Sequence, residues 1–236
     1  MLLRRVAIAL DWMLDTALLV LFILLFLIGG YTMYDTWFVY EHAQDTSILA
    51  YKPQSGTAAE EVAPISEDAV AWLTIDDTGI DYPVMQGVDN NEYLNKDPYG
   101  NYSLSGSIFL DSRNASDFSD PYSLIYGHHM EHGVMFGALD KFLDRSYFDD
   151  HRRGTLIVTG GKTYDIRLFA CVEADGAQQE IFAPNENDGP LAYVREHAAI
   201  WYEPEGEQLI AMSTCKFPET SERIIVFGVL HENEME

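Results

Sequence analysis

The 236-residue sequence predicts a mainly-β domain, closed into a β-barrel or stacked as a sandwich, with an N-terminal transmembrane helix in front of it. Three observations predict this architecture. One long uncharged apolar run lies near the start of the chain. Many short segments rich in β-branched and aromatic residues follow it, separated by turn residues. Segments with helical spacing are few, and numerous short strands with few helices are typical of closed barrels and sandwiches.

The apolar run occupies residues 16–34, which carry no charge, and about 20 apolar residues suffice to span a bilayer. Arg4 and Arg5 precede it, so the positive-inside rule predicts a single-pass anchor with residues 1–15 in the cytoplasm and the rest of the chain outside. A cleaved signal peptide is the alternative. The run is longer than a typical signal-peptide core and no clear small-x-small cleavage site follows it, which favours the anchor. Aromatic residues suited to the outer membrane interface lie at the end of the run and just beyond it: Tyr31, Tyr34, Trp37 and Tyr40.

Residues 35–65 are expected to join the anchor to the folded domain, first as a helical continuation over 36–52 and then as a linker over 53–64, which contains Pro, Ser and Gly. The folded domain is expected to comprise residues 66–236. Ser66, followed by two acidic residues, is typical of a helix start and predicts a short helix over 69–73.

Strand signals dominate the remainder of the domain. We expect strands at 73–75, 80–85, 107–110, 124–126, 155–159, 163–173, 208–214 and 224–230. Gly160-Gly161 predicts a hairpin between two of them. We expect helical segments over 135–143 and over 190–200, the latter capped by Asn187 or Asp188.

The composition limits the classes of function. The chain has 38 acidic and 14 basic residues and a formal net charge of −24, so its surface should repel nucleic acid. Cys171 and Cys215 are too few for a disulfide framework and lack metal-ligand spacing, although one disulfide would be permitted in an exported domain. Cys171 lies within an alternating strand, which predicts a buried core thiol.

Cys215 ends one predicted strand and Arg223 begins the next. A thiol in this position can act as a nucleophile, and a guanidinium nearby can stabilise a developing oxyanion. The intervening turn is short, which leaves open how Arg223 reaches the thiol. The local sequence contains no general base.

The histidine cluster at 128–132 has three interpretations. His128, Glu131 and His132 match an H-x-x-E-H zinc motif, which requires a helix; a strand and a glycine precede this stretch and no third ligand is evident, so we expect no metal. Alternatively, His128 directly follows the strand 124–126 and can act as an acid and base, because imidazole gives and accepts protons near neutral pH. The third interpretation is a solvated loop.

Together these segments resemble the sortases, and class B sortases in particular, from about Trp72 to Leu230. The matching pieces, in chain order, are Asp81 to Gly87, Asp89-Asn90 and Tyr93-Leu94, Gly106 to Asp111, Tyr126 to Met130, Met135 to Gly137, Ser213 to Cys215, and Arg223. Each piece alone is weak, and their order and spacing together are specific. One departure is Ala211-Met212, where the family usually has Thr-Leu, which predicts altered packing without loss of the chemistry.

The resemblance implies a closed sortase-type β-barrel and a membrane-anchored cysteine transpeptidase of the Gram-positive cell envelope. It implies Cys215 as nucleophile, His128 as general acid and base, and Arg223 as oxyanion stabiliser. His128 rather than His129 is implied because the family's histidine directly follows the glycine at the strand end. Asn90, Leu94 and Ser213 match positions that line the family's substrate groove.

The implied partners are a surface protein bearing a C-terminal sorting signal and an amine, either of a peptidoglycan precursor or of a pilin lysine. No cofactor or metal is implied; calcium binds some class A members, but carboxylate-rich surfaces are usually only solvated. Two alternatives to wall anchoring are a pilin polymerase and a non-catalytic exported binding module.

Overall fold

The computed structural model describes residues 2–43, 46–53, 65–184, 189–215 and 220–233. The chain divides into two compact units, one up to His42 and one from Ala43 onward. The linker expected at 53–64 lies almost entirely outside the described residues, as do the expected caps Asn187 and Asp188.

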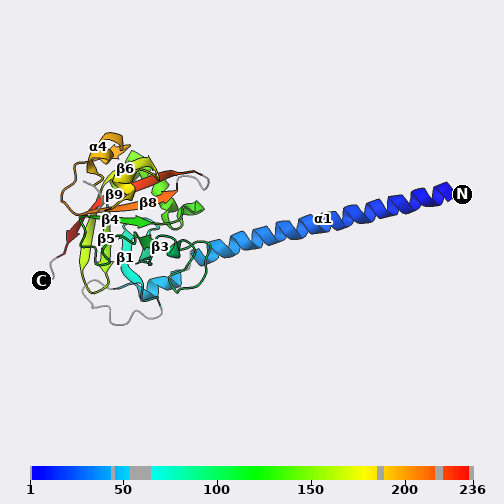
Figure 1. Ribbon diagram of the computed structural model, residues 1–236, viewed down its shortest axis with the longest axis horizontal. Coiled ribbons are helices and arrows are strands. Elements are labelled where there is room, and N and C mark those ends of the chain that lie inside the picture. The colour runs from blue at the N-terminus through cyan, green and yellow to red at the C-terminus, as the bar shows by residue number, and fades with distance from the viewer. Residues whose placement is uncertain (1, 44–45, 54–64, 185–188, 216–219, 234–236) are drawn as a thin grey trace. The chain divides into compact units, whose positions relative to one another are not determined.

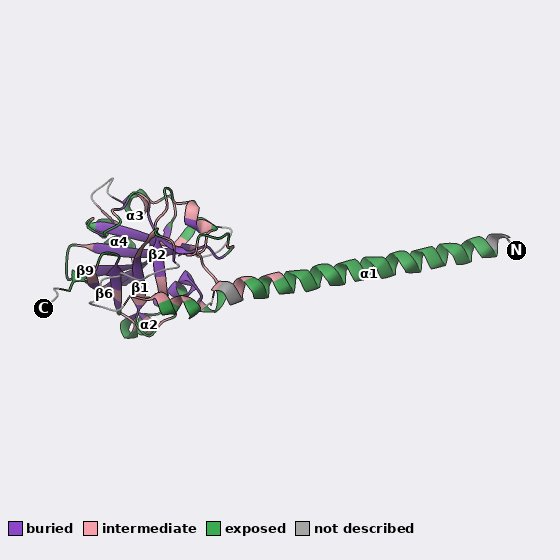
Figure 2. Cartoon of the chain, turned by 90° about the horizontal axis from the view of Figure 1, so that it is seen from below, coloured by how far each residue is buried: buried purple, intermediate pink, exposed green. Residues whose placement is uncertain are grey.

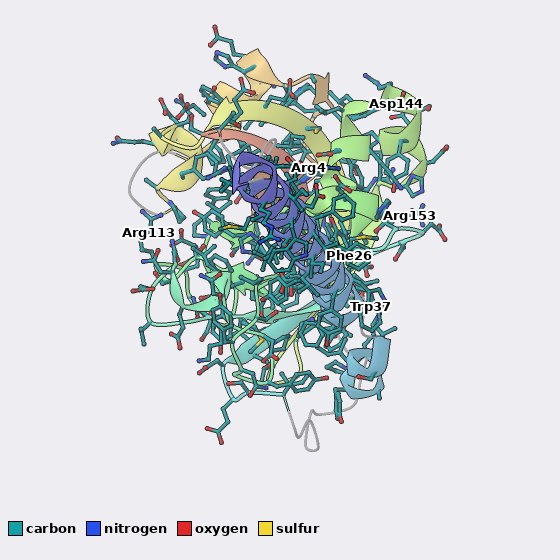
Figure 3. All side chains as sticks on the ribbon, turned by 90° about the vertical axis from the view of Figure 1, so that its right-hand side faces the viewer. Arg4, Phe26, Trp37, Arg113, Asp144 and Arg153 are labelled. Atoms are coloured by element: carbon teal, nitrogen blue, oxygen red, sulfur yellow. The ribbon has the colours of Figure 1, made fainter. Side chains whose placement is uncertain are left out.

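The first unit consists of the long helix α1 (Leu2–Ala43) up to His42, and it contains the predicted anchor. Residues 4–34 are all exposed, and Figure 2 shows this helix in the colour of exposed residues along most of its length. Phe26, labelled on α1 in Figure 3, is 74% exposed. Arg4–Tyr40 is long and apolar enough to cross a membrane. An apolar surface of this extent needs a lipid or protein environment to cover it.

The second unit is a β-barrel. The strands are β1 (Ala69–Ile75), β2 (Asp81–Met85), β3 (Ile108–Leu110), β4 (Tyr122–Tyr126), β5 (Arg153–Val158), β6 (Thr163–Asp175), β7 (Ile200–Trp201), β8 (Leu209–Cys215) and β9 (Glu222–Glu232). Within the described residues the hydrogen-bonded order is β5-β1-β2-β3-β4-β8-β9-β6-β7, and β5 also pairs with β6. This last pairing closes eight strands into a barrel, with β7 attached to β6, so the predicted barrel is confirmed over the sandwich (Figure 1).

Short helices connect the strands. They are the α-helices α2 (Arg145–Asp150), α3 (Gln179–Phe182) and α4 (Leu191–His197), and the 3₁₀ helices η1 (Thr46–Tyr51), η2 (Glu92–Leu94), η3 (Glu131–Gly133) and η4 (Phe136–Leu143). The helical segment expected over 135–143 is therefore 3₁₀. The helix expected over 190–200 ends earlier, because the chain there turns into β7, which pairs with β6.

The helix predicted after Ser66 is wrong. Residues 69–73 begin β1, which pairs with β2 on one side and β5 on the other. The Ser66 hydroxyl accepts the Asp68 N–H, and the Ser66 carbonyl accepts the Ala69 N–H, so Ser66 stabilises a turn. The local sequence suits a helix start, but two neighbouring strands and the burial of Trp72 and Leu73 make the extended form more stable.

Three adjacent strands, β4, β8 and β9, supply much of the core. Each is buried along most of its length, and together with β6 they form an apolar cluster that includes Phe169, Leu124 and Phe227. Cys171 on β6 is fully buried and free, as predicted for a core thiol. These buried strands have little freedom to shift, so they fix the positions of the residues at their ends.

Candidate active site

The register of β4 and β8 brings His128 and Cys215 to the same edge of the barrel. The two strands are parallel, with Tyr126 opposite Ser213. His128 follows β4 by two residues and Cys215 follows Ser213 by two, so the two chains reach this edge in step. The Gly127 N–H donates to the Ser213 carbonyl at 3.1 Å, and the Thr214 hydroxyl donates to the Gly127 carbonyl at 2.9 Å, which holds them together beyond the end of β4.

Arg223 faces Cys215 directly across the antiparallel pair β8–β9. Its Nη1 donates to the Cys215 sulfur at 2.8 Å and contacts the Thr220 carbonyl at 3.4 Å. Arg223 therefore reaches the thiol despite the short connection, because the antiparallel pairing of β8 and β9 places Cys215 and Arg223 opposite each other. A guanidinium at this distance favours negative charge on the sulfur and on any oxyanion that forms beside it.

The imidazole of His128 is oriented by the backbone. Its Nε2 lies 2.7 Å from the carbonyl oxygen of Leu94 in η2. A carbonyl oxygen accepts hydrogen bonds and cannot donate them, so Nε2 carries a hydrogen in this arrangement and Nδ1 remains available for proton exchange. The Leu94 carbonyl thus holds the ring in one orientation, as a hydrogen-bonded third group holds the histidine of a catalytic triad.

The other histidines of the cluster lie outside this arrangement. His129 Nε2 pairs with the Asp140 carboxylate at 2.7 Å, and His132 has a positive φ of 61° within η3, so the stretch is not the continuous helix that an H-x-x-E-H zinc site requires. Within the described part of the chain, no group of three or more His, Cys, Asp or Glu side chains is placed to hold a metal ion.

One pocket of about 280 Å³ contains all six residues that the sequence predicted for the site. Its lining comprises Asn90, Leu94, Phe109, Tyr126, Gly127, His128, Ser213, Thr214, Cys215 and Arg223. The sequence interpretation missed Phe109, Tyr126, Gly127 and Thr214 as lining residues. Three of these are sequence neighbours of predicted residues and could have been inferred from the strand ends, whereas Phe109 belongs to β3 and is brought in by its pairing with Tyr126.

The substrate-groove candidates differ in how they are held. Asn90 Nδ2 donates to Asp111 Oδ2 at 2.9 Å, and Asn90 Oδ1 accepts the Ser112 N–H at 2.8 Å. Ser213 is 1% exposed, and its hydroxyl has no hydrogen-bond partner within the described structure. A buried hydroxyl on a pocket wall can hydrogen-bond a bound molecule.

The two thiols have different surroundings. Burial raises the pKa of Cys171 well above its ordinary value, so this thiol stays neutral and unreactive. Cys215 is half-buried and opens onto the pocket. Burial, followed by the nearby Asp111 charge, also raises the pKa of Tyr126, which remains a neutral phenol that donates a hydrogen bond to Asp111 at 2.9 Å.

Comparison with known proteins shows which family this chain is similar to. The family profile described as "Sortase domain" matches residues 73–231. Sortase B of Listeria monocytogenes is 40% identical over 114 residues, which cover 48% of this chain and 46% of that protein. Sortase B of Staphylococcus aureus is 27% identical over 230 residues, which cover 89% of this chain and 94% of that protein.

A solved structure gives a similar result. A class B sortase of Streptococcus pyogenes involved in pilus biogenesis is 38% identical, with a TM-score of 0.65, covering 71% of this chain and 94% of that one. Of the two Sortase B relatives, the Listeria monocytogenes protein is matched over less than half of its length and the Staphylococcus aureus protein over nearly all of it.

Proposed function

The chain belongs to the sortase family, and we propose that it is a membrane-anchored class B cysteine transpeptidase that cleaves a sorting signal and joins the released protein to an amine. The observation that carries this proposal is the pocket in which the Cys215 sulfur accepts a hydrogen bond from Arg223 while His128 lines the same cavity. A nucleophile, an oxyanion donor and an acid and base in one pocket are the groups that acyl transfer needs.

In the first half of the reaction, the proton of the Cys215 thiol passes to Nδ1 of His128, and the resulting thiolate attacks the carbonyl carbon of a threonine in the signal. The tetrahedral oxyanion that forms is stabilised by the Arg223 guanidinium, which already lies beside the sulfur. His128 donates a proton to the amide nitrogen as the carbon–nitrogen bond breaks. The C-terminal fragment leaves as an amine, and a thioester joins the threonine to Cys215.

In the second half, an incoming amine attacks the thioester carbon. His128 accepts the proton of the attacking nitrogen, the carbon–sulfur bond breaks, and the thiolate is regenerated beside Arg223. The reaction forms one amide bond for the one that it breaks, so it needs no coupled energy source. The Leu94 carbonyl keeps Nε2 protonated, which leaves Nδ1 to carry the proton in both halves.

The proposed substrate is a surface protein whose signal is of the Leu-Pro-X-Thr-Gly or Asn-Pro-X-Thr type, and Asn90, Leu94 and Ser213 are proposed to line its groove. The proposed amine belongs to a peptidoglycan precursor. The proposed location is the cell membrane, with α1 crossing once, Arg4 and Arg5 on the cytoplasmic side, and the barrel outside.

A pilin polymerase is the second candidate, with a pilin lysine as the amine. The observation in its favour is the 38% identity to the Streptococcus pyogenes class B sortase involved in pilus biogenesis. The two candidates share the first half of the reaction and differ in the amine that resolves the thioester. Competition between a cell-wall peptide and a pilin lysine peptide for the same acyl-enzyme distinguishes them.

The proposed chemistry is tested by incubating the protein with a panel of sorting-signal peptides and recording its intact mass. The wild type should gain the mass of the peptide up to its threonine, and Cys215→Ala should gain none. Cys171→Ala is the matched control and should still form the adduct. If the wild type forms no adduct and cleaves no peptide in the panel, the barrel is a non-catalytic binding module.

A further inference from the structure

We propose that Asp111 is a positioning residue for peptide binding, because its buried carboxylate fixes the orientation of Asn90 and Tyr126 on one wall of the pocket. This proposal rests on the proposed function, since it requires a peptide in the pocket. Asp111 itself does not line the pocket, so it acts through the two residues that do.

The Asp111 carboxylate is fully buried at the end of β3 and accepts five hydrogen bonds. Oδ1 accepts the N–H and the Nε–H of Arg113, at 3.0 and 2.9 Å. Oδ2 accepts Arg113 Nη2, Asn90 Nδ2 and Tyr126 Oη, each at 2.9 Å. Burial by itself raises the pKa of this carboxyl, but the hydrogen bonds from Arg113, Asn90 and Tyr126 outweigh it, and the pKa of Asp111 is lowered. The group is therefore a buried anion that accepts and does not donate.

This anion determines which way the Asn90 amide points. An ionised carboxylate cannot donate, so the amide must turn its NH₂ group toward Asp111. The Ser112 N–H cannot accept, so the amide must turn its oxygen toward Ser112. The two contacts exclude the flipped amide. They leave one N–H and one oxygen lone pair of Asn90 for a ligand, a combination that matches a peptide group or a carboxamide side chain.

The same carboxylate fixes the aromatic part of the wall. The Tyr126 hydroxyl donates to Oδ2, and its ring lies near the rings of Phe109 and Phe182, with centroids 5.3 and 6.5 Å away. Arg113 connects the carboxylate to α3, because its Nη2 also donates to the Phe182 carbonyl at 2.6 Å. Figure 3 shows Arg113 at the edge of the domain, and its side chain is 39% exposed.

Neither Asp111 nor Arg113 is placed at the reacting sulfur, which Arg223 contacts from the opposite strand. Loss of the Asp111 charge should therefore weaken peptide binding and leave the chemistry at Cys215 largely intact. Asp111→Asn replaces one acceptor oxygen by a donor, so the Asn90 amide can flip and the Tyr126 hydroxyl loses a charged partner. Because hydrogen bonds to charged groups are stronger than those between neutral groups, we expect KM for a signal peptide to rise about tenfold or more.

The experiment is a kinetic double-mutant cycle on the full chain in detergent, with a cleaved signal peptide as substrate. Asp111→Asn and Asn90→Ala should each raise KM with kcat within about threefold of the wild type. If Asp111 acts through Asn90, kcat/KM of the double variant should be no more than about threefold below that of the single variant with the lower kcat/KM. The rate of Cys215 alkylation by iodoacetamide should be unchanged in all three.

Asp81→Asn is the matched control, because Asp81, like Asp111, accepts hydrogen bonds from three side chains, here Lys52, Trp72 and Thr74, and it lies outside the pocket lining. It should lower thermal stability and leave KM unchanged. If Asp111→Asn does not fold, Arg113→Gln replaces it in the cycle, since Arg113 is partly exposed and holds the carboxylate in place.

Two results overturn the positioning role. In the first, the losses in kcat/KM of the two single variants multiply in the double variant, so the residues act independently. In the second, Asp111→Asn lowers kcat and the rate of Cys215 alkylation while KM is unchanged, so the residue acts on the chemistry. Both results require a wild type that cleaves peptide. A wild type that cleaves none refutes the proposed function instead, so the two failures are distinguishable.

Discussion

Gly127→Ala tests how strictly packing behind the active site sets the position of His128. Gly127 lies between the end of β4 and His128, and hydrogen bonds through its N–H and its carbonyl hold it against β8. A Cβ at this position would lie 2.4 Å from Ile108 Cδ1 and 2.7 Å from Phe136 Cδ2. Phe136 is fully buried and has little room to move.

The first contact falls about 1 Å short of ordinary van der Waals separation and the second about 0.7 Å, so either the ring or the backbone must shift. Overpacking of this kind costs about 1–3 kcal/mol of stability. If the backbone yields, His128 moves by a comparable distance, and a displacement of about 1 Å can reduce the rate about 100-fold. We therefore expect a large fall in kcat from a substitution that adds one methyl group and changes no reacting atom.

The assay is peptide cleavage at saturating substrate, with thermal unfolding measured in parallel. Gly154→Ala is the matched control, because a Cβ there would lie 2.4 Å from the Thr74 carbonyl oxygen, in β1 and away from the pocket. It should be destabilised as strongly and retain the wild-type kcat. The reasoning is refuted if Gly127→Ala is destabilised and still turns over like the wild type, or if both variants lose kcat equally.

Three further outcomes are expected. Arg223→Lys should lower kcat about 100- to 1,000-fold in the peptide cleavage assay, because an ammonium cannot reproduce the guanidinium donor beside the sulfur; a near-normal kcat would contradict an oxyanion role. The pKa of Asp111 is lowered in the folded protein, so its contribution to stability is present above the unfolded carboxyl pKa of about 3.9 and is lost as the pH falls through the folded value. In chemical denaturation from pH 7 to pH 3, Asp111→Asn should therefore lose less stability than the wild type. An equal loss of stability in the two proteins would contradict this contribution. Removal of residues 1–42 should release the protein from membranes in a sedimentation assay while peptide cleavage persists, and continued sedimentation of the truncated chain would show a second membrane contact.

The candidate membrane span and the candidate site residues could be predicted from the sequence without a structure. The candidate membrane span depends on a run of apolar residues long enough for a bilayer, and that property belongs to one continuous segment. Cys215, His128 and Arg223 were singled out because the order and spacing of short motifs resembled one family; their position at strand ends fits acyl transfer but did not exclude a solvated histidine loop or a surface arginine. The roles of these residues stay predictions until kinetics test them.

Long-range pairing decided the rest. Residues 69–73 suit a helix start locally, and only β2 and β5 on either side make them a strand. The choice between barrel and sandwich depended on the β5–β6 pairing, and the access of Arg223 to the thiol depended on the register of β8 with β9. The hydrogen bonds that Asn90, Arg113 and Tyr126 donate to the Asp111 carboxylate likewise depend on the fold, because they join separate segments of the chain. Sequence determines which chemical groups are present and which segments are apolar, because those are properties of single residues and short runs. Distances between groups far apart in the chain are set by which strands pair and in which register, and that is a property of the whole closed sheet.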